Sequence, residues 1–514
     1  MATTSRNRTS PAAKKATKDT ADKKTSAAPS APPAAPGDLL DMDQAIAALA
    51  TTRPTFYRWL RAGTVKGVKV GRQWRFRRED IERFLRGEGP RVDLPADIRP
   101  LITTLRERLG ETGAAPAGDQ LALAAALMLR TALHLDASDL HLLAMMETGT
   151  MQLRVDGALM GIATFDVRLQ PLLVETFKRM SAMDSAVTDM PQDGRIRLRN
   201  GERQIDVYIT TVPTSHGECL VARFADQSRT LPALDDLRFA AREKALIVQA
   251  LKAPNGMVVF TGPSGSGKTT ALYVCAQHAS APDARLVSVE THPAFNLPGA
   301  VRVRVDPRRN MSYPAVLRAV MRMDPDIVAI DDIHDHETME VAVECAVTGH
   351  LVLANLHAPD AIGALRQIAE LATGIPGALD ELHCIVAQRL LRRVCTDCAV
   401  AGNPPAALAR QAERVAGSGG VMWSSLSPTW KRAVGCPACN DTGFRGRFMV
   451  VEALEVTRDL LTALRRGASD GELRSIAVGQ GFATMTADGV RKAAEGVTTL
   501  DEVARLLPDW AGTA

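Results

Sequence analysis

Hydrophobic and polar positions change their spacing several times along the 514 residues, and these changes mark domain boundaries. Residues 1–37 are rich in Ala, Pro, Ser, Thr and Lys, lack aromatic residues and show no apolar period. Such a segment buries too little surface to offset the entropy lost on ordering, so we predict a disordered basic tail. Two roles stay open for it: keeping the protein in solution, or attracting nucleic acid without sequence preference.

Residues 38–90 have the spacing of short helices around a β-hairpin. We expect one helix at 42–49 and a second around 55–60, with Thr51 and Thr52 in the turn between them. Strand patterns flank Gly71, and a third helix is expected at 80–85. This order predicts a helix pair with a tight turn, followed by a hairpin or wing and a closing helix.

The stretch resembles the excisionase/MerR-like winged helix-turn-helix module through the segments TTRPTFYRWLRAG and KVGRQWRFRREDIERF. The resemblance implies that the helix around 55–60 enters a major groove of duplex DNA, with Arg53 and Arg58 near bases or phosphates. It places three further arginines on the DNA backbone: Arg72, Arg75 and Arg77. A module that kept this fold but binds a protein instead of DNA is the alternative.

The spacing after residue 90 predicts a linker and two further domains. Residues 91–117 read as a linker with one helix. Residues 118–236 read as a separate α+β domain without a strand–helix–strand rhythm. An apolar helix is expected at 121–135, and short strands follow at 151–157, 194–199, 203–214 and 218–226. In residues 237–394 strands and helices alternate, with strand runs at 257–260, 286–290, 327–332 and 351–354. That rhythm predicts an α/β core built on a parallel sheet.

A glycine-rich turn follows the first strand of this core. Residues 257–270 read MVVFTGPSGSGKTT, in which apolar residues precede the pattern G-x-x-x-x-G-K-[ST]. Glycines let backbone N–H groups point at phosphate oxygens, the lysine neutralises the β- and γ-phosphates, and the threonine hydroxyl can bind Mg²⁺. We predict that ATP and Mg²⁺ bind here, with Thr269 on the metal, through Gly262, Pro263, Ser264, Gly265, Ser266, Gly267, Lys268, Thr269 and Thr270.

Two carboxylates end a second strand of the core. The run DIVAIDD at 326–332 finishes in Asp331 and Asp332. Either acid can hold the water shell of Mg²⁺, and the other can orient the attacking water. His357 follows the strand that ends at Leu356, where a residue can sense the γ-phosphate. The alternative for His357 is an ordinary polar residue at a strand end.

Four of the eight cysteines form two C-x-x-C pairs. Cys395 with Cys398 and Cys436 with Cys439 have the spacing of a tetrahedral Zn²⁺–thiolate site. We predict structural Zn²⁺ in a subdomain at 395–450, because four thiolate ligands leave no open position for catalysis; a redox-active pair is the alternative. Residues 451–514 are expected to be a helical region.

Composition and charge narrow the class of protein. With 46% hydrophobic and 23% charged residues, the chain reads as a soluble cytosolic protein without a secretory signal or a transmembrane segment, since its longest apolar run spans only 121–129. The net charge is +4, but residues 1–90 hold 18 Lys and Arg against 9 Asp and Glu, which leaves the rest of the chain at −5. The basic excess predicts an anionic partner for the first ninety residues, and the helix-turn-helix resemblance implies that this partner is duplex DNA, bound through residues 38–90.

Several motifs in order resemble the type II secretion / type IV pilus assembly ATPase family. The match covers about residues 118–505, and beyond the phosphate loop it includes PQDGRIRLR (191–199), VPTSHGE (212–218), LRAVMRMDPD (317–326), TGHLVLANLHAPDA (348–361), AQRLLRRVCTDC (387–398) and GCPACNDTGFRGR (435–447). The resemblance implies a PAS-like domain at 118–236, a RecA-like P-loop ATPase core at 237–394, and six subunits in a ring with ATP between the two domains. It implies a zinc subdomain near the region that engages an inner-membrane platform protein, and a location in the cytoplasm or peripherally at the inner membrane.

A ring also gives several arginines a role. Arg318 and Arg322 are four residues apart, and Arg195 and Arg197 are two apart on a strand, so each pair shares one face. Their guanidinium groups can reach phosphates from a neighbouring domain or subunit. The alternative is a solvated face with surface ion pairs.

The chain departs from the family in its acidic motifs. Where the family has E-D-P-x-E, residues 290–294 read ETHPA, and only Glu290 is kept as a candidate catalytic carboxylate. Where the family has G-E-I-R-D, residues 331–335 read DDIHD, so Asp332 stands at the catalytic glutamate position with a side chain one methylene shorter. At two positions where the family has arginine, this chain has Tyr208 and Cys219. We expect nucleotide binding to survive and turnover to be slow, because a shift of about 1 Å in a positioned base can cost on the order of 10²-fold.

Two hypotheses for the function follow. The phosphate loop, the zinc cysteines, the two histidines His350 and His357, and the Arg318 and Arg322 pair favour a hexameric ATPase motor for pilus assembly or secretion. The helix-turn-helix pattern, which replaces the family's usual platform-binding N-terminal region, favours a nucleotide-sensing regulatory or scaffold protein with weakened hydrolysis. We interpret the chain as an ATP-hydrolysing family member with a DNA-binding appendage.

Overall fold

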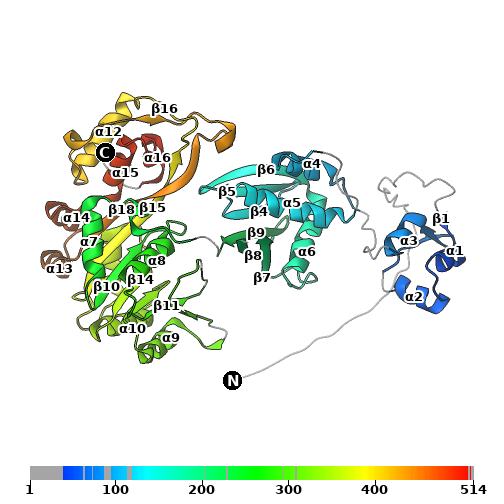
Figure 1. The fold of residues 1–514 in the computed structure, drawn as a ribbon, viewed down its shortest axis with the longest axis horizontal. Helices are drawn as coiled ribbons and strands as arrows, with labels where there is room; N and C mark the ends of the chain where they lie inside the picture. The colour runs from blue at the N-terminus through cyan, green and yellow to red at the C-terminus, as the bar shows by residue number, and fades with distance from the viewer. Residues whose placement is uncertain are drawn as a thin grey trace, which may run out of the picture. The chain divides into compact units, whose positions relative to one another are not determined.

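The structure is a computed structural model that describes residues 39–61, 64–71, 73–85, 94–112, 118–201, 203–226, 230–291, 293, 295–306, 309–507 and 510. The chain divides into two compact units, residues 1–93 and 94–514, which are treated separately below (Figure 1). The tail predicted at 1–37 and the predicted DNA contact Arg72 lie outside the described residues, as does His292 of the altered acidic motif.

The N-terminal unit holds the helix-turn-helix module. Its elements are β1 (Leu39–Leu40), α1 (Met42–Ala48), α2 (Arg53–Arg61), β2 (Val68–Val70), β3 (Gln73–Arg77) and α3 (Arg78–Leu85). Asp41 starts α1 through a capping box with Gln44, which satisfies two backbone N–H groups that a helix start leaves free. Phe56 of α2 and Phe76 of β3 are fully buried and meet edge to face with ring centroids 5.0 Å apart. The apolar spacing that predicted these elements therefore builds one small core.

The hairpin of the module carries one strand more than the sequence predicted. Residues Leu39 and Leu40 pair antiparallel with Arg77 and Phe76, so the strand order is β1-β3-β2. A two-residue strand has too few positions to show an alternating pattern, and it forms because β3 offers an unpaired edge.

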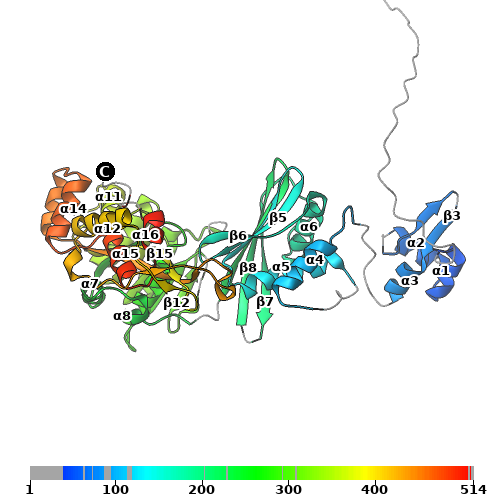
Figure 2. The same ribbon diagram turned by 90° about the horizontal axis from the view of Figure 1, so that it is seen from above.

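The first part of the second unit is a six-stranded antiparallel sheet with helices on one face (Figures 1 and 2). The sheet has the order β6-β5-β4-β9-β8-β7. Its elements, with the flanking helices, are α4 (Arg99–Arg108), α5 (Gln120–His134), β4 (Asp139–Ala144), β5 (Thr148–Val155), β6 (Ala158–Asp166), α6 (Gln170–Met180), β7 (Gln192–Asn200), β8 (Arg203–Thr214) and β9 (Gly217–Asp226). An antiparallel sheet covered on one face is the α+β arrangement that the strand spacing indicated.

Helix α4 belongs to this core, although its residues fall within the stretch predicted as a linker. Pro100 lies in its first turn, where a missing N–H is tolerated. Leu101, Ile102 and Leu105 are buried in the same apolar cluster as α5. The spacing of these three residues is that of one helix face, which anchors the segment to the sheet.

The second part is a seven-stranded sheet with helices on both faces. The order is β12-β11-β13-β14-β10-β15-β18, all neighbours being parallel except β15 and β18. The strands are β10 (Gly256–Thr261), β11 (Leu286–Glu290), β12 (Val301–Arg304), β13 (Ile327–Ile330), β14 (Leu351–Leu356), β15 (Leu382–Val394) and β18 (Phe444–Glu455). The helices are α7 (Ala241–Leu251), α8 (Lys268–Ala279), α9 (Tyr313–Val320), α10 (His336–Val347) and α11 (Ala361–Leu371).

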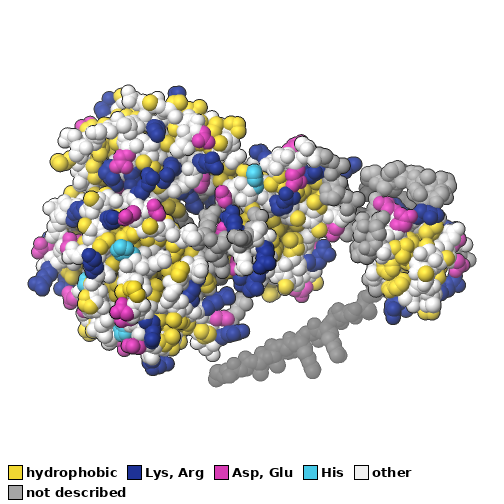
Figure 3. All heavy atoms as spheres, viewed as in Figure 1, with side chains coloured by type: hydrophobic (Ala, Val, Ile, Leu, Met, Phe, Trp, Pro, Cys, Tyr) yellow, Lys and Arg dark blue, Asp and Glu magenta, His cyan; other side chains and the backbone are white. Residues whose placement is uncertain are grey.

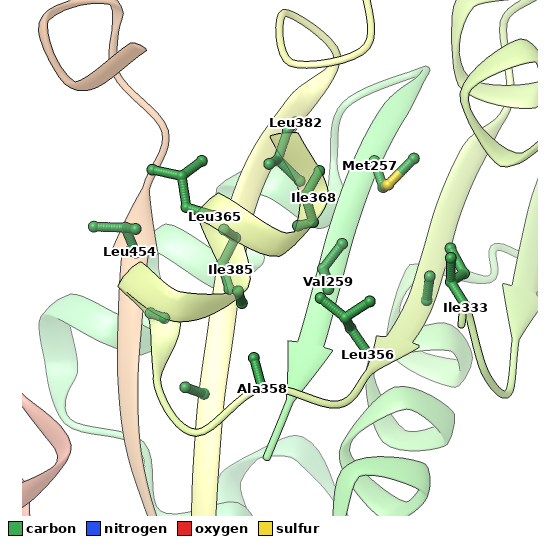
Figure 4. Packing of buried hydrophobic residues seen from close by; sticks show 14 of the residues in the cluster. Met257, Val259, Ile333, Leu356, Ala358, Leu365, Ile368, Leu382, Ile385 and Leu454 are labelled. Carbon is green, nitrogen blue, oxygen red and sulfur yellow. The ribbon is translucent and has the colours of Figure 1, made fainter. Parts of the chain in front are cut away.

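Alternate residues of the central strands enter two different cores. On β10, Met257 and Val259 pack with α9, α10 and α11, whereas Val258 and Phe260 pack with α7 and α8. Figure 4 shows the first cluster, with Met257 and Val259 beside Leu356, Ile385 and other residues of the neighbouring elements. A strand buried on both faces explains the unbroken apolar run that precedes the glycine-rich loop.

An insertion and a helical region complete the fold. Between β15 and β18 lie β16 (Val400–Ala401), α12 (Ala406–Ser418) and β17 (Lys431–Arg432), and after β18 come α13 (Arg458–Arg465), α14 (Asp470–Gly479), α15 (Met485–Ala494) and α16 (Leu500–Leu506). Residues 444–450, which fall in the range expected for the zinc subdomain, are the start of β18 at the edge of the large sheet. Among the described residues, no helix is long and apolar enough to cross a membrane.

Candidate nucleotide site and metal centre

The glycine-rich loop connects β10 to α8 and has the backbone of a phosphate cradle. Gly262, Gly265 and Gly267 have φ values of 143°, 76° and 90°, which other residues rarely adopt. A Cβ atom at Gly262 would lie 2.4 Å from the carbonyl oxygen of Gln388, so a side chain there is excluded by packing as well. The loop ends at the N-terminus of α8, where free N–H groups and the helix dipole favour an anion.

Lys268 is held inside the loop that it closes. The residue is 7% exposed, and its Nζ donates to the carbonyl oxygens of Gly262 at 2.7 Å and of Pro263 at 3.3 Å. Burial lowers the pKa of Lys268, while the charges of Asp332 and Asp331 oppose that shift. The ammonium group is therefore already placed among the loop atoms, and a bound phosphate would further offset the cost of its burial.

Asp331 lies next to the predicted magnesium ligand. Its Oδ1 is 3.5 Å from the Thr269 hydroxyl, which donates toward it. Burial, and then the nearby charges of Glu290 and Asp332, raise the pKa of Asp331 to about 6. Hydroxyl and carboxylate oxygens are the ligands that Mg²⁺ prefers, so these two residues fit the metal or its water shell.

Asp332 lies between two histidines. Its Oδ1 is buried without a hydrogen-bond partner and lies 3.8 Å from Nε2 of His357, while its Oδ2 lies 3.6 Å from Nδ1 of His334. His357 in turn places Nδ1 3.4 Å from the Lys268 Nζ. A buried carboxylate oxygen without a protein partner can accept a hydrogen bond from a water.

His334 was not among the residues predicted for the site. It follows Asp332 by two positions in the DDIHD run, where the resembled family has an arginine, so the departure from that pattern is the signal that could have identified it. His334 also lies 3.2 Å from Asp335 and packs edge to face on Tyr313.

Glu290 lies in a buried cluster behind the loop. The residue is 2% exposed, and Arg302 donates to both of its oxygens, at 3.1 Å from Nε and 2.8 Å from Nη2. The hydroxyl groups of Ser288 and Tyr273 donate to it as well. Sequence reasoning did not single out Arg302, Ser288 or Tyr273, because their contacts join three separate elements.

The predicted arginines are engaged by acids of this chain or by backbone oxygens. Arg318 on α9 pairs with Glu337 at 2.9 Å, and Arg322, on the 3₁₀ turn 321–323, donates to the Arg318 carbonyl. Arg195 makes a paired contact with Asp206, 2.9 Å from Nε to Oδ1, and Arg197 lies 3.9 Å from the same carboxylate. Within one chain, Arg318, Arg195 and Arg197 therefore pair with carboxylates, and Arg322 donates to a backbone carbonyl.

The four predicted zinc cysteines come together at the base of the insertion. One sulfur from each lies within 4.8 Å of the others, with Sγ–Sγ distances of 3.9 Å for Cys395–Cys436 and Cys398–Cys439 and 3.7 Å for Cys436–Cys439. A tetrahedral Zn²⁺ with Zn–S bonds of about 2.3 Å places its sulfurs about 3.8 Å apart. The geometry therefore matches a Zn²⁺–thiolate centre.

Backbone groups support negative charge on these sulfurs. The N–H groups of Gly435, Cys436 and Gly443 point at sulfurs of the cluster, at 3.4, 3.2 and 3.2 Å. Hydrogen bonds from backbone N–H groups favour the charged form of an acceptor, and thiolates are the form that binds a metal.

The described basic residues of the helix-turn-helix module lie on its surface. Arg53 pairs with Asp43 at 3.0 Å, Arg58 is exposed, and Arg75 donates to Gln73. Arg77, at the end of β3, is half-buried. The space-filling view shows basic side chains at the rim of an apolar face of this module (Figure 3).

Comparison with known proteins agrees with both parts of the chain. Residues 119–505 match the family described as Type II/IV secretion system protein, and residues 39–89 match a helix-turn-helix domain. The chain is 37% identical over 374 residues to the type II secretion system protein HxcR of Pseudomonas aeruginosa, an alignment that covers 73% of this chain and 74% of the relative. It is 32% identical over 432 residues to the type IV pilus assembly ATPase PilB of Myxococcus xanthus, covering 83% and 75%.

The fold has a counterpart among solved structures. The X-ray structure of the ATPase DotB of Legionella pneumophila superimposes with a TM-score of 0.52 at 18% identity and covers 74% of this chain and 94% of that one. At this identity the likeness concerns the fold. Taken with the phosphate loop, the acid pair and the sequence matches, it shows that the chain belongs to the type II secretion and type IV pilus assembly ATPase family and carries an N-terminal helix-turn-helix domain.

Proposed function

We propose that the protein is an ATP-hydrolysing motor that works as a ring of six subunits in protein secretion or pilus assembly, with a reduced turnover. The observation that carries this proposal is the convergence of Lys268, Thr269, Asp331, Asp332 and His357 around one phosphate loop. The antiparallel domain and the ATPase core correspond to the PAS-like and RecA-like domains of the family, and ATP binds between them.

The distances suggest a division of labour between the two acids. Asp331, beside the Thr269 hydroxyl, is placed for the magnesium shell, and Asp332, with its free Oδ1, is placed to orient the attacking water. Bound Mg²⁺ supplies positive charge to the phosphate oxygens as negative charge develops on them. His357 contacts both Lys268 and Asp332, so a hydrogen bond between His357 and the γ-phosphate would affect the positions of both residues.

Asp332 sets the rate in this proposal. Its side chain is one methylene shorter than the glutamate of the family, which leaves the carboxylate on the order of 1 Å short of its best position and slows turnover up to about 10²-fold. Nucleotide affinity is expected to stay high, since the loop, Lys268 and Thr269 are complete.

Assembly would give the surface arginines new partners. Arg318 is half-exposed and pairs with a carboxylate that is itself 60% exposed, so the ion pair holds it weakly. In a ring, Arg318, Arg322 and Arg195 could exchange these partners for a phosphate of a neighbouring subunit. The zinc subdomain would lie near an inner-membrane platform protein, on the cytoplasmic side.

A single assay tests the proposal. Purified protein should hydrolyse ATP in a Mg²⁺-dependent way. The rate of hydrolysis per subunit should increase with protein concentration as rings form. A protein that binds ATP and never releases phosphate, at any concentration, would contradict the motor and favour a nucleotide sensor.

A second candidate function is regulation through DNA. It is favoured by exposed basic residues on α2 of the module, among them Arg58 and Arg61, since this helix contains no acidic residue. Basic side chains at a recognition helix contact phosphates and bases. The same ATPase assay with and without duplex DNA separates the two: a change in turnover that requires residues 39–85 would tie the module to the ATPase through DNA.

A further inference from the structure

A buried carboxylate, that of Glu290, lies at the end of β11 and takes no part in the proposed hydrolysis. Glu290 is the last residue of β11, and the neighbouring β13 leads directly into Asp331 and Asp332. By position, Glu290 is thus a third acid at the same edge of the sheet. Its side chain, however, is 2% exposed and fully engaged by other residues.

The contacts turn Glu290 toward α8. Both carboxylate oxygens accept hydrogen bonds from Arg302 of β12, and the Tyr273 hydroxyl donates to one of them. Tyr273 lies one helical turn after Thr269 on α8, so the carboxylate points to the turn beyond the magnesium ligand. Arg302 also packs over the Tyr273 ring, 5.7 Å from its centre, and donates to the Phe295 carbonyl, which fixes the guanidinium from three sides.

The charge of Glu290 still reaches the site. The backbone N–H of Asp331 donates to the carbonyl oxygen of Val289 at 3.0 Å, so Glu290 and Asp331 follow directly neighbouring positions of the two strands. The positive charge of Arg302 compensates for an acid that would otherwise be buried and unpaired.

We propose that Arg302 is a positioning residue that holds Glu290 against α8 and away from the attacking water, so that Asp332 alone orients that water. This inference rests on the proposed ATP hydrolysis. Without the positive charge, Glu290 is held only by the hydroxyl groups of Tyr273 and Ser288, so this longer acid can turn toward the water that Asp332 reaches poorly.

The first test is Glu290→Gln, because Arg302 is 25% exposed and can stay solvated without its partner. We expect kcat within about threefold of the wild type, whereas loss of an acid that activates water typically costs about 10²-fold or more. Asp332→Asn is the matched control and should show the large loss. A loss in Glu290→Gln as large as that in Asp332→Asn would overturn the proposal.

The second test is Arg302→Gln, which keeps hydrogen-bond donors and removes the charge. We expect kcat to rise several-fold, and the double variant Glu290→Gln/Arg302→Gln to return to the wild-type value. If Arg302→Gln does not fold, Arg302→Lys replaces it, since lysine keeps the charge but cannot bind both oxygens. We then expect a smaller rise in kcat. A folded Arg302 variant with unchanged or lower kcat would contradict the proposal.

Two further readouts do not depend on turnover. The Mg²⁺ dependence of ATP binding should be unchanged in Glu290→Gln and weakened in Asp331→Asn; equal weakening in both would place Glu290 in the metal shell and overturn the inference. Without nucleotide, Arg302→Gln should lower Tm more than Glu290→Gln, because it leaves a buried anion unpaired. Failure of the proposed function would instead appear as an inactive wild type, while these two readouts still decide the role of Glu290.

Discussion

The nucleotide site and the helix-turn-helix module both concentrate charge, but they hold it in opposite ways. Around the loop, Lys268 is 7% and Glu290 2% exposed, and both have defined hydrogen-bond partners. In the module, Arg53 has a side chain that is 60% exposed, and its acidic partner Asp43 is 82% exposed. A buried charge must be compensated locally, whereas an exposed one is compensated by water.

This difference decides what each region reveals about its function. In the nucleotide site the partners of the charges indicate a chemistry, because a buried atom without a partner, such as Oδ1 of Asp332, indicates where a ligand or water can bind. In the module the exposed arginines indicate only that a partner is negatively charged. The variants below test whether changes at buried, locally compensated groups have larger effects than changes at the exposed charges of the module. They are ordered from the largest expected effect to the smallest.

The largest effect is expected for Lys268→Ala. The change removes the cation that the loop holds for the phosphates and leaves the Gly262 carbonyl without its donor, so ATP affinity should fall by about 10²-fold or more. Binding of a fluorescent ATP analogue measures this. Lys252→Ala, at an exposed lysine after α7, is the control and should bind normally. Equal affinity in both variants would place the nucleotide elsewhere.

Removing a zinc ligand should have the next largest effect. Cys436→Ser should lower the Zn²⁺ content from about one per chain to a small fraction and make the insertion between β15 and β18 sensitive to protease. Elemental analysis of protein prepared without chelators measures the metal. Cys219→Ser, outside the cluster, serves as the control. Protein without Zn²⁺ whose insertion resists protease would show that the cluster needs no metal.

A buried acid of the second unit, Glu452, should make stability depend on pH. Glu452 is 1% exposed and accepts the N–H groups of Ala361 and Met485, at the starts of α11 and α15. Burial raises its pKa from the ordinary 4.5 to about 7. Between about pH 4.5 and 7 the carboxyl group is therefore protonated in the folded protein and ionised in the unfolded chain. The free energy of unfolding is highest below pH 4.5 and decreases as the pH rises toward about 7.

The matched pair Glu452→Gln and Glu455→Gln tests this pH dependence. Glu452→Gln should flatten the dependence of Tm on pH between about 4.5 and 7, whereas the exposed Glu455 on the same strand should leave it unchanged. Identical pH profiles for the wild type and Glu452→Gln would show that the carboxyl group ionises normally despite its burial.

The contrast also explains how far sequence reasoning reached. The apolar run before Gly262 and the DIVAIDD strand predicted the loop and the acid pair because each is a local pattern. The sulfur cluster was predicted because each C-x-x-C pair is local and two such pairs complete the four ligands of a Zn²⁺ site. The Arg302–Glu290 contact could not be predicted, since it joins β11 to β12 through side-chain packing. Strand β1, with two residues, and the docking of α4 were missed for the same reason: both depend on surfaces supplied by distant segments.

The smallest effects are expected in the module. If it binds duplex DNA, Arg58→Ala or Arg75→Ala should weaken binding several-fold and reduce the slope of log affinity against log salt by about one, because each loses one phosphate contact. Arg466→Ala, an exposed arginine after α13, is the control. The absence of salt-sensitive binding by the full chain at about 10⁻⁴ M would support a protein partner for the module instead.

The central claim is that Asp332 orients the attacking water from a position slightly too far back. The most direct measurement is the steady-state rate of ATP hydrolysis by the wild type, Asp332→Glu and Asp332→Asn at saturating ATP and Mg²⁺. We predict that Asp332→Glu raises kcat, by up to about 10²-fold, while Asp332→Asn binds ATP with little change in affinity and hydrolyses it at a small fraction of the wild-type rate. Equal rates in the two variants would contradict the account and assign the water to Asp331 or Glu290.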